Sequence, residues 1–465
     1  MTREPPRPFR LMSVDLPVVF ALAVVPVIWP TLLSIGPTTI EPFHLAVLLV
    51  VGVTLCQPRC LIAVVAIVRD NIVFVAFFTL YLFLLSVSFL HSMEGSAFRE
   101  LIVKQSAFAA FAACIAARVA SMPDAGRTLY VGGIAGLLAF FAVLSLSAQA
   151  AGVGLLDALV SLGQSGDYKA WVYKFLKPAL SSFAAPVVGN AEEIAAARKN
   201  NIASGLLVCL LCYIIGHVSR RTAVSRQFLH YSLLGLFLAS LLMMLSRSVM
   251  LSLILSVLPI VAVKILRGRD PLFIVAAFAT ATSLMLAYLL VPQGIIDGLA
   301  ARFFDDTTSF ESRLSSYSEA FKVIEQNLVY GVGLGGRIDE KTVHNLFLYA
   351  WLQAGVLAFL VIFVAWSYLV FRVLEHLWRL LVDNTWTTRG EITLHAWIAA
   401  LPIMALVRVW VSGGGTLNFA AWLSIGVFLG LLARHRRPSP VPRRLPAADP
   451  SPAPTGLGQR QDLSR

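Results

Sequence analysis

The feature that most constrains this chain is the recurrence of long apolar segments through nearly all of its 465 residues. About 20 apolar residues cross the hydrocarbon core of a bilayer as an α-helix, and a helix satisfies its own backbone hydrogen bonds there. Charged residues make up only 13% of the chain, whereas soluble domains carry roughly 25%. We therefore predict an all-α polytopic membrane protein with about 12 transmembrane helices.

Two long polar loops separate the predicted spans, near residues 151–200 and 293–343, and both fall on the same side of the membrane. A shorter apolar run at 60–68 fits either a re-entrant or a surface segment. Residues 1–433 are thus predicted to form one membrane domain, and the basic, Pro-rich residues 434–465 a disordered tail. The predicted spans are 16–36, 42–56, 72–90, 105–120, 129–150, 201–218, 228–246, 249–266, 271–292, 344–371, 392–411 and 416–432.

The net charge of +12 would suit nucleic-acid binding, but the placement of Lys and Arg argues against that function. In the short loops they concentrate on the side that holds the N-terminus, which is the pattern of cytoplasmic loops. The charge therefore indicates topology, with both termini in the cytoplasm. The first span lacks a small-residue cleavage site, so we expect it to remain as an uncleaved anchor.

His344 and Asn345 stand where the second outer loop ends and a long apolar helix begins. Side-chain packing does not explain the His344 imidazole at the start of a membrane helix. A histidine there can accept a proton from a substrate held at the lipid surface. We predict His344 as a general base, with Asn345 as a polar neighbour in the same cavity.

Two arginines on the same predicted side are candidate ligands for phosphate. Arg247 lies between two serines in a very short connection between two apolar spans, where it either snorkels to the headgroups or binds phosphate through paired hydrogen bonds. Arg313 lies near the start of a loop helix, where it either pairs with Glu311 or faces the same ligand.

Three further polar residues are candidates for the same cavity. Arg408 falls inside the eleventh predicted span, where a charge is costly, and it either lines the cavity or is a structural arginine. Arg198 and Asn201 stand at the outer end of the sixth span. Asn201, with the preceding Asn200, either caps that helix or faces the cavity.

The second outer loop has a predicted structure of its own. Apolar residues recur at helical spacing between Ser309 and Asn327, which predicts an amphipathic helix capped near Ser309 or Ser312 that can lie on the membrane surface. The following run, Gly331 to Gly336, fits G-x-G-x-x-G, but a dinucleotide site needs a soluble βαβ unit. We expect a flexible connection between the amphipathic helix and the His344 helix.

No metal site is expected, because Asp305 and Asp306 lack the spacing and the neighbouring ligands that a metal site needs.

Four motifs together resemble the O-antigen ligase and polymerase superfamily, over roughly residues 198–360. They are Leu245-Ser-Arg-Ser248, Ser312-Arg313, the glycine run from Gly331 and His344-Asn345. The resemblance implies an inner-membrane protein that transfers glycan from an undecaprenyl-diphosphate-linked donor on the periplasmic face, without a metal or other cofactor. It further implies that Arg247 and Arg313 hold the diphosphate while His344 deprotonates the acceptor.

The resemblance leaves the reaction open between a ligase acting on the lipid A core of lipopolysaccharide, an O-antigen or exopolysaccharide polymerase, and a protein-glycosylating ligase. A flippase or transporter of lipid-linked oligosaccharide is the alternative from another class. That alternative predicts charges in the middle of several spans and often an internal repeat. The candidate residues instead gather at one side, and we find no repeat.

Overall fold

The structure is a computed structural model of the chain. It describes residues 15–24, 33–35, 38–40, 42–92, 98–150, 154, 157, 160–161, 191–220, 227–244, 246–267, 308–334, 343, 345–382, 389–411 and 418–436.

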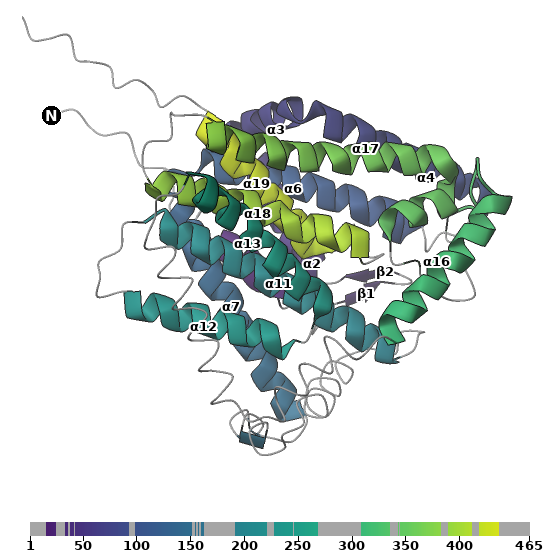
Figure 1. The fold of residues 1–465 in the computed structure, drawn as a ribbon. Coiled ribbons are helices and arrows are strands. Elements are labelled where there is room, and N and C mark those ends of the chain that lie inside the picture. Colours follow the sequence, from purple (N-terminus) through teal and green to yellow (C-terminus); the bar gives the residue numbers. More distant parts are fainter. Residues whose placement is uncertain are drawn as a thin grey trace, which may run out of the picture.

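These residues form a bundle of long helices that run roughly alongside one another (Figure 1). Its N-terminal helices are α1 (Asp15–Val24), α2 (Pro42–Leu55), α3 (Pro58–Asp70), α4 (Ile72–Ser92), the short π-helix η2 (Arg99–Val103), α6 (Lys104–Ser121) and α7 (Ala125–Ala150). The later helices are α11 (Ala191–Val218), α12 (Gln227–Met243), α13 (Arg247–Arg267), α16 (Thr308–Gln326), α17 (Leu346–Val382), α18 (Arg389–Val411) and α19 (Phe419–Arg436).

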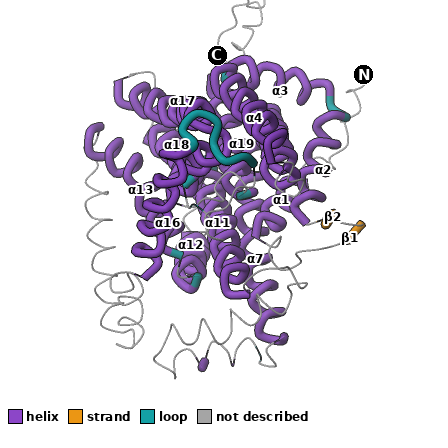
Figure 2. The backbone as a smooth tube through the Cα atoms, turned by 90° about the vertical axis from the view of Figure 1, so that its right-hand side faces the viewer, coloured by secondary structure: helices purple, strands orange, loops and turns teal. Residues whose placement is uncertain are grey.

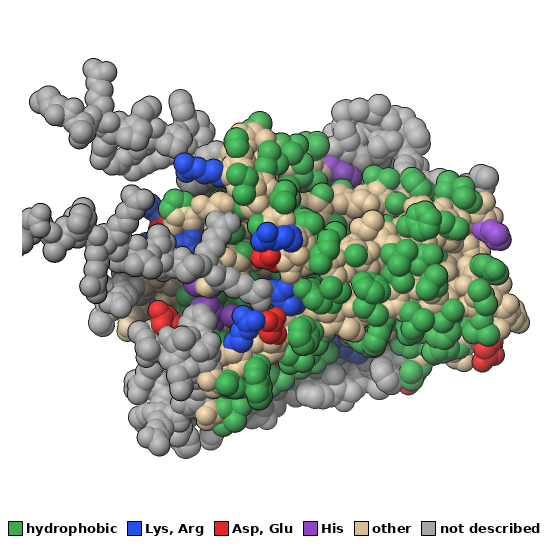
Figure 3. All heavy atoms as spheres, turned by 90° about the horizontal axis from the view of Figure 1, so that it is seen from above, with side chains coloured by type: hydrophobic (Ala, Val, Ile, Leu, Met, Phe, Trp, Pro, Cys, Tyr) green, Lys and Arg blue, Asp and Glu red, His purple; other side chains and the backbone are tan. Residues whose placement is uncertain are grey.

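Seven helices in the described part of the chain are long and apolar enough to cross a membrane, or up to eight if the bent pair α2–α3 is one span. The other predicted spans correspond to the shorter apolar helices α1, α12 and α19 and to 271–292, which lies outside the described residues. Hydrophobic side chains cover much of the face in Figure 3, and most Lys and Arg side chains on it lie toward its left-hand part. The protein is thus a helical membrane protein.

The first predicted span, 16–36, is wrong in length. Helix α1 ends at Val24, and Leu33–Ile35 is instead strand β1, paired antiparallel with strand β2, Thr38–Ile40, at the edge of the bundle (Figure 2). The sequence after Val24 holds Pro26 and Pro30, and proline cannot donate the hydrogen bond that would continue a helix.

The ambiguous run at 60–68 is part of a helix in the structure. Helix α3 bends by 106° from α2 and packs one face, with Cys60, Ala63 and Ile67, into the protein. Helix α19 continues through Arg434 to Arg436, and the rest of the predicted tail lies outside the described residues.

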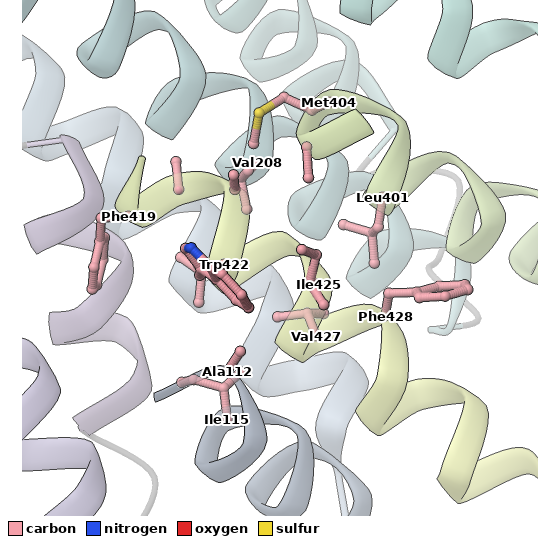
Figure 4. Close-up of a cluster of buried hydrophobic side chains, with 14 of the residues drawn as sticks. Ala112, Ile115, Val208, Leu401, Met404, Phe419, Trp422, Ile425, Val427 and Phe428 are labelled. Atoms are coloured by element: carbon pink, nitrogen blue, oxygen red, sulfur yellow. The ribbon is translucent and has the colours of Figure 1, made fainter. Parts of the chain in front are cut away.

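The core is centred on α19, whose large apolar side chains meet α6, α11 and α18 (Figure 4). Trp422 and Phe428 are fully buried there. Gly426 and Gly430 allow α6 to approach closely, because an added Cβ would lie 2.7 Å from the Ala112 oxygen and 2.5 Å from the Ala116 oxygen. Small residues serve this purpose in membrane helices, where packing rather than water exclusion holds helices together.

Arginines tie the helix ends together at one end of the bundle. Arg118 in α6 forms a buried ion pair with Asp15 of α1, at 2.7 Å. Arg372 in α17 donates to the Asp70 carbonyl at 2.9 Å, between α3 and α4. Arg434 in α19 donates to the Pro123 carbonyl at 2.8 Å, in the turn between α6 and α7. These basic residues close turns that the positive-inside pattern assigns to the cytoplasmic side.

Helix α17 is broken at Ala354 and Gly355, and backbone bonds from the turn after α16 fill the break. The amides of Val332 and Gly333 donate to the carbonyls of Leu352 and Gln353, at 2.7 and 3.2 Å. The Val356 amide donates to the Leu328 carbonyl at 3.0 Å. We call this pairing of residues 328–333 with 352–356 the α17 clasp. It satisfies backbone groups that the break would otherwise leave without a partner inside a membrane helix.

The glycines of the clasp are required by its geometry, and the described part of the run brings the helix after His344 beside the amphipathic helix. Gly331 and Gly355 have φ values of 70° and 81°. A Cβ on Gly355 would lie 1.8 Å from the Val329 oxygen, and one on Gly331 would lie 2.6 Å from the Leu352 oxygen. Gly335 and Gly336 lie outside the described residues.

The predicted amphipathic helix is α16, which begins one residue before Ser309. The clasp attaches it to α17, and its buried residues Ala320 and Ile324 pack against Val343 and Leu352. Figure 1 shows α16 at the right-hand end of the bundle, running obliquely to α17. The clasp therefore fixes the helix that carries Arg313 beside the start of the helix that follows His344.

We expect Gly355→Ala to destabilise the protein by about 3 kcal/mol or more, because alanine must adopt a strained φ and also clash with Val329. Thermal unfolding in detergent would measure the loss. Gly235→Ala is the matched control, since nothing lies within 4 Å of a Cβ at that position in α12. The control should unfold at the wild-type temperature or slightly above it. Equal unfolding temperatures for the two variants would contradict the role of the clasp.

Candidate active site

One end of the bundle brings together the first residues of α13 and α17, the last turn of α18 and the residue before α19. Figure 2 looks at this end, where α17, α18 and α19 lie close together. Partly buried polar side chains from α11 join them. We call this group the polar cluster, and its members are Asn200, Asn201, Ser246, Ser248, Arg408 and Asn418.

Arg408 is at the centre of the polar cluster. Its guanidinium donates to Ser248 Oγ at 3.1 Å and to Asn201 Oδ1 at 3.4 Å. Asn418 Nδ2 donates to the same Asn201 oxygen at 3.0 Å. Arg408 and Asn418 are only 3% and 2% exposed, so both are removed from solvent. Neutral oxygens of α13 and α11 thus bind a buried cation.

Both serines that flank Arg247 belong to the polar cluster. Ser246 Oγ donates to Asn200 Oδ1 at 2.7 Å, and the two serine hydroxyls are 3.4 Å apart. Arg247 itself is partly buried and is the first residue of α13. A guanidinium at a helix N-terminus, where backbone N–H groups are also available, suits an anion such as phosphate.

Asn345 caps α17, a role that was not predicted for it. Its Oδ1 accepts from the amides of Phe347 and Leu348 at 2.9 and 3.2 Å, and its Nδ2 donates to the Trp410 carbonyl at 3.3 Å. The cap therefore also joins the start of α17 to the last turn of α18, two residues beyond Arg408. A cavity role for Asn345 stays a prediction.

Asn200 and Asn201 do not cap their helix, so that alternative is wrong. Helix α11 begins at Ala191, and both asparagines lie well inside it. The segment before them is rich in Ala and Glu, which favour helix although they are not all apolar. Their side chains instead hold Ser246 and Arg408.

Three candidate residues are less completely placed. His344 lies outside the described residues, although its neighbours Val343 and Asn345 are described. Arg313 and Arg198 belong to α16 and α11, but their side chains also lie outside the described part.

Sequence reasoning missed Asn418. It precedes α19, and its Oδ1 accepts from the Ala421 amide at 3.1 Å, as in a helix cap. The predicted span 416–432 included Asn418, whereas α19 begins one residue after it. Nothing in the sequence indicates that it also reaches Asn201.

Residues 231–363 match the family model for O-Antigen ligase. A search of curated proteins gave no match. The matched region holds most of α12, all of α13 and α16 and the first half of α17, and so includes Arg247, Arg313 and His344. Asn201, Arg408 and Asn418 lie outside it. The match over this region supports the resemblance of the chain to the O-antigen ligase and polymerase superfamily.

Proposed function

We propose that this protein is an inner-membrane glycosyltransferase that transfers or polymerises glycan from an undecaprenyl-diphosphate-linked donor on the periplasmic face. The observation that carries the proposal is the position of Arg247. It begins α13 inside the matched family region, at the bundle end where the polar cluster lies. A membrane-bound diphosphate needs a cation held at this kind of boundary between helix bundle and headgroups.

Arg247 and Arg313 hold the diphosphate in this proposal. When the acceptor oxygen attacks the anomeric carbon, the bond from that carbon to the diphosphate oxygen breaks and the leaving group gains negative charge. Guanidinium groups already in place stabilise this charge without rearranging at the moment of reaction. The α17 clasp supports a role for Arg313, because it holds α16 against α17.

His344 takes the proton from the acceptor hydroxyl. An ordinary histidine has a pKa of about 6.5, so its ring is largely neutral near pH 7 and can accept a proton. The neighbours of His344 support this role: Val343 packs against α16, and Asn345 binds the end of α18. The donor is activated by its diphosphate, so the transfer needs neither a nucleotide nor a metal.

The periplasmic orientation is supported by the arrangement of basic residues. The turns tied by Arg372 and Arg434 lie at the bundle end opposite Arg247, and the positive-inside pattern assigns that end to the cytoplasm. Both termini are then cytoplasmic. The acceptor is a growing glycan or the lipid A core.

We expect His344→Ala, Arg247→Ala and Arg313→Ala to lower glycan transfer by roughly 10²-fold or more, because each removes a group that acts on the reacting atoms. The assay is transfer from a purified lipid-linked glycan, with protein level measured alongside. His91→Ala is the matched control, since His91 is an exposed histidine near the end of α4. Full activity of the His344 variant would refute the base assignment.

Deleting the gene distinguishes ligase from polymerase. Loss of a ligase should leave long glycan chains on the lipid carrier, because polymerisation continues without transfer. Loss of a polymerase should leave single repeat units. The measurement is the length distribution of the glycan on the carrier and on the acceptor, with the wild-type gene restored as control. An unchanged distribution would exclude both activities.

A further inference from the structure

We propose that Arg408 is a positioning residue that fixes Arg247 for the donor diphosphate, acting through Ser248 and the asparagines of α11. This inference rests on the proposed function, because it takes Arg247 as a diphosphate ligand. Arg408 lies outside the matched family region, so the family match assigns it no role.

Because Arg408 is buried, it is not itself a ligand of the substrate. Its side chain is 3% exposed, and its two terminal nitrogens bind oxygens of α13 and α11. Arg247, in contrast, is only partly buried. The planar guanidinium can bridge two acceptors in fixed directions, whereas a lysine ammonium is a single point charge on a flexible stem. Arg408 therefore joins two helices and leaves Arg247 to meet the substrate.

Arg247 lies between two tethers that come from different helices. On one side Ser246 binds Asn200 of α11, at 2.7 Å. On the other side Ser248 binds Arg408 of α18, at 3.1 Å. The first turn of α13 is therefore held from both directions. A catalytic group displaced by about 1 Å can cost about 10²-fold in rate, so such tethers have a functional consequence.

The last turn of α18 also contacts the start of α17, beside the proposed base. Two residues after Arg408, the Trp410 carbonyl accepts from Asn345. The same turn therefore contacts the start of α13, next to Arg247, and the start of α17, next to His344. Asn418 strengthens the arrangement by binding the Asn201 oxygen that Arg408 also uses. One helix end thus binds the sequence neighbours of both the diphosphate ligand and the base.

The kinetic test uses Arg408→Met, Arg408→Lys and Ser248→Ala in purified protein with a lipid-linked donor. We expect Arg408→Met to raise the donor KM at least tenfold, with a smaller effect on kcat, and Arg408→Lys to restore part of the loss. In an Arg247→Lys background, Arg408→Met should add less than twofold, because its effect passes through Arg247. An unchanged donor KM, or a full additional loss in that background, would overturn the proposal.

A second readout does not depend on catalysis. Arg247→Cys in a Cys56→Ser background is labelled with a membrane-impermeant thiol reagent. The background removes Cys56 because it is the exposed native cysteine, whereas the other four are buried. We expect Arg408→Met to change the labelling rate at position 247 at least fivefold. An unchanged rate would contradict the tether. If Arg247→Ala transfers glycan normally, the proposed function fails while the labelling result still decides the tether.

Arg372→Met is the matched control for both readouts. Arg372 is an arginine of similar burial, 5% exposed, at the opposite end of the bundle. Its loss should lower the unfolding temperature but leave the donor KM and the labelling of position 247 at wild-type values. An equal rise in KM in this control would show that Arg408 acts only through general stability.

Discussion

Backbone hydrogen bonds between the turn after α16 and the break in α17 hold the functional half of the molecule together. A helix in a membrane has no water to satisfy its free backbone groups, so an interruption at Gly355 requires partners from elsewhere in the protein. Residues 328–333 supply them, and the glycines allow the two backbones to approach. The position of α16 relative to α17 follows from this pairing.

The two ends of the bundle use arginine differently. At one end Arg118 pairs with a carboxylate, and Arg372 and Arg434 close turns through backbone carbonyls. At the other end Arg408 binds neutral side chains beside Arg247. A buried cation in a membrane helix is costly, and such residues tend to be functional. Because Arg408 lies beside Arg247, its end of the bundle is a candidate for handling an anionic substrate.

Much of the helical architecture could be predicted, because hydropathy alone determines which segments enter a bilayer. The predicted spans at 72–90 and 249–266 match α4 and α13 to within two residues at each end. The prediction failed at 16–36, where prolines follow α1, and at Asn200, where a polar but helix-favouring segment extends α11. The break in α17 was hidden inside an apolar run.

The candidate site was less accessible to prediction. Arg408 was selected because a charge in a span is costly, and Asn201 because it stands at the outer end of a span, but their mutual contact joins positions 207 residues apart. Periodicity within one helix cannot identify a partner on another helix, so Asn418 was missed. The cap made by Asn345 is local, because its side chain binds the amides two and three residues later in the chain. An asparagine directly before an apolar helix is a recognisable signal for such a cap.

The α17 clasp has a consequence for how such proteins can diversify. Leu334 directly follows residues 328–333 of the clasp, and Val343 lies shortly before α17. Both residues are buried against neighbouring helices. Because the anchor points are set by backbone bonds and apolar contacts, substitutions or changes of length between them need not shift the surrounding helices. Variation in this interval is therefore compatible with an unchanged arrangement of α16 and α17.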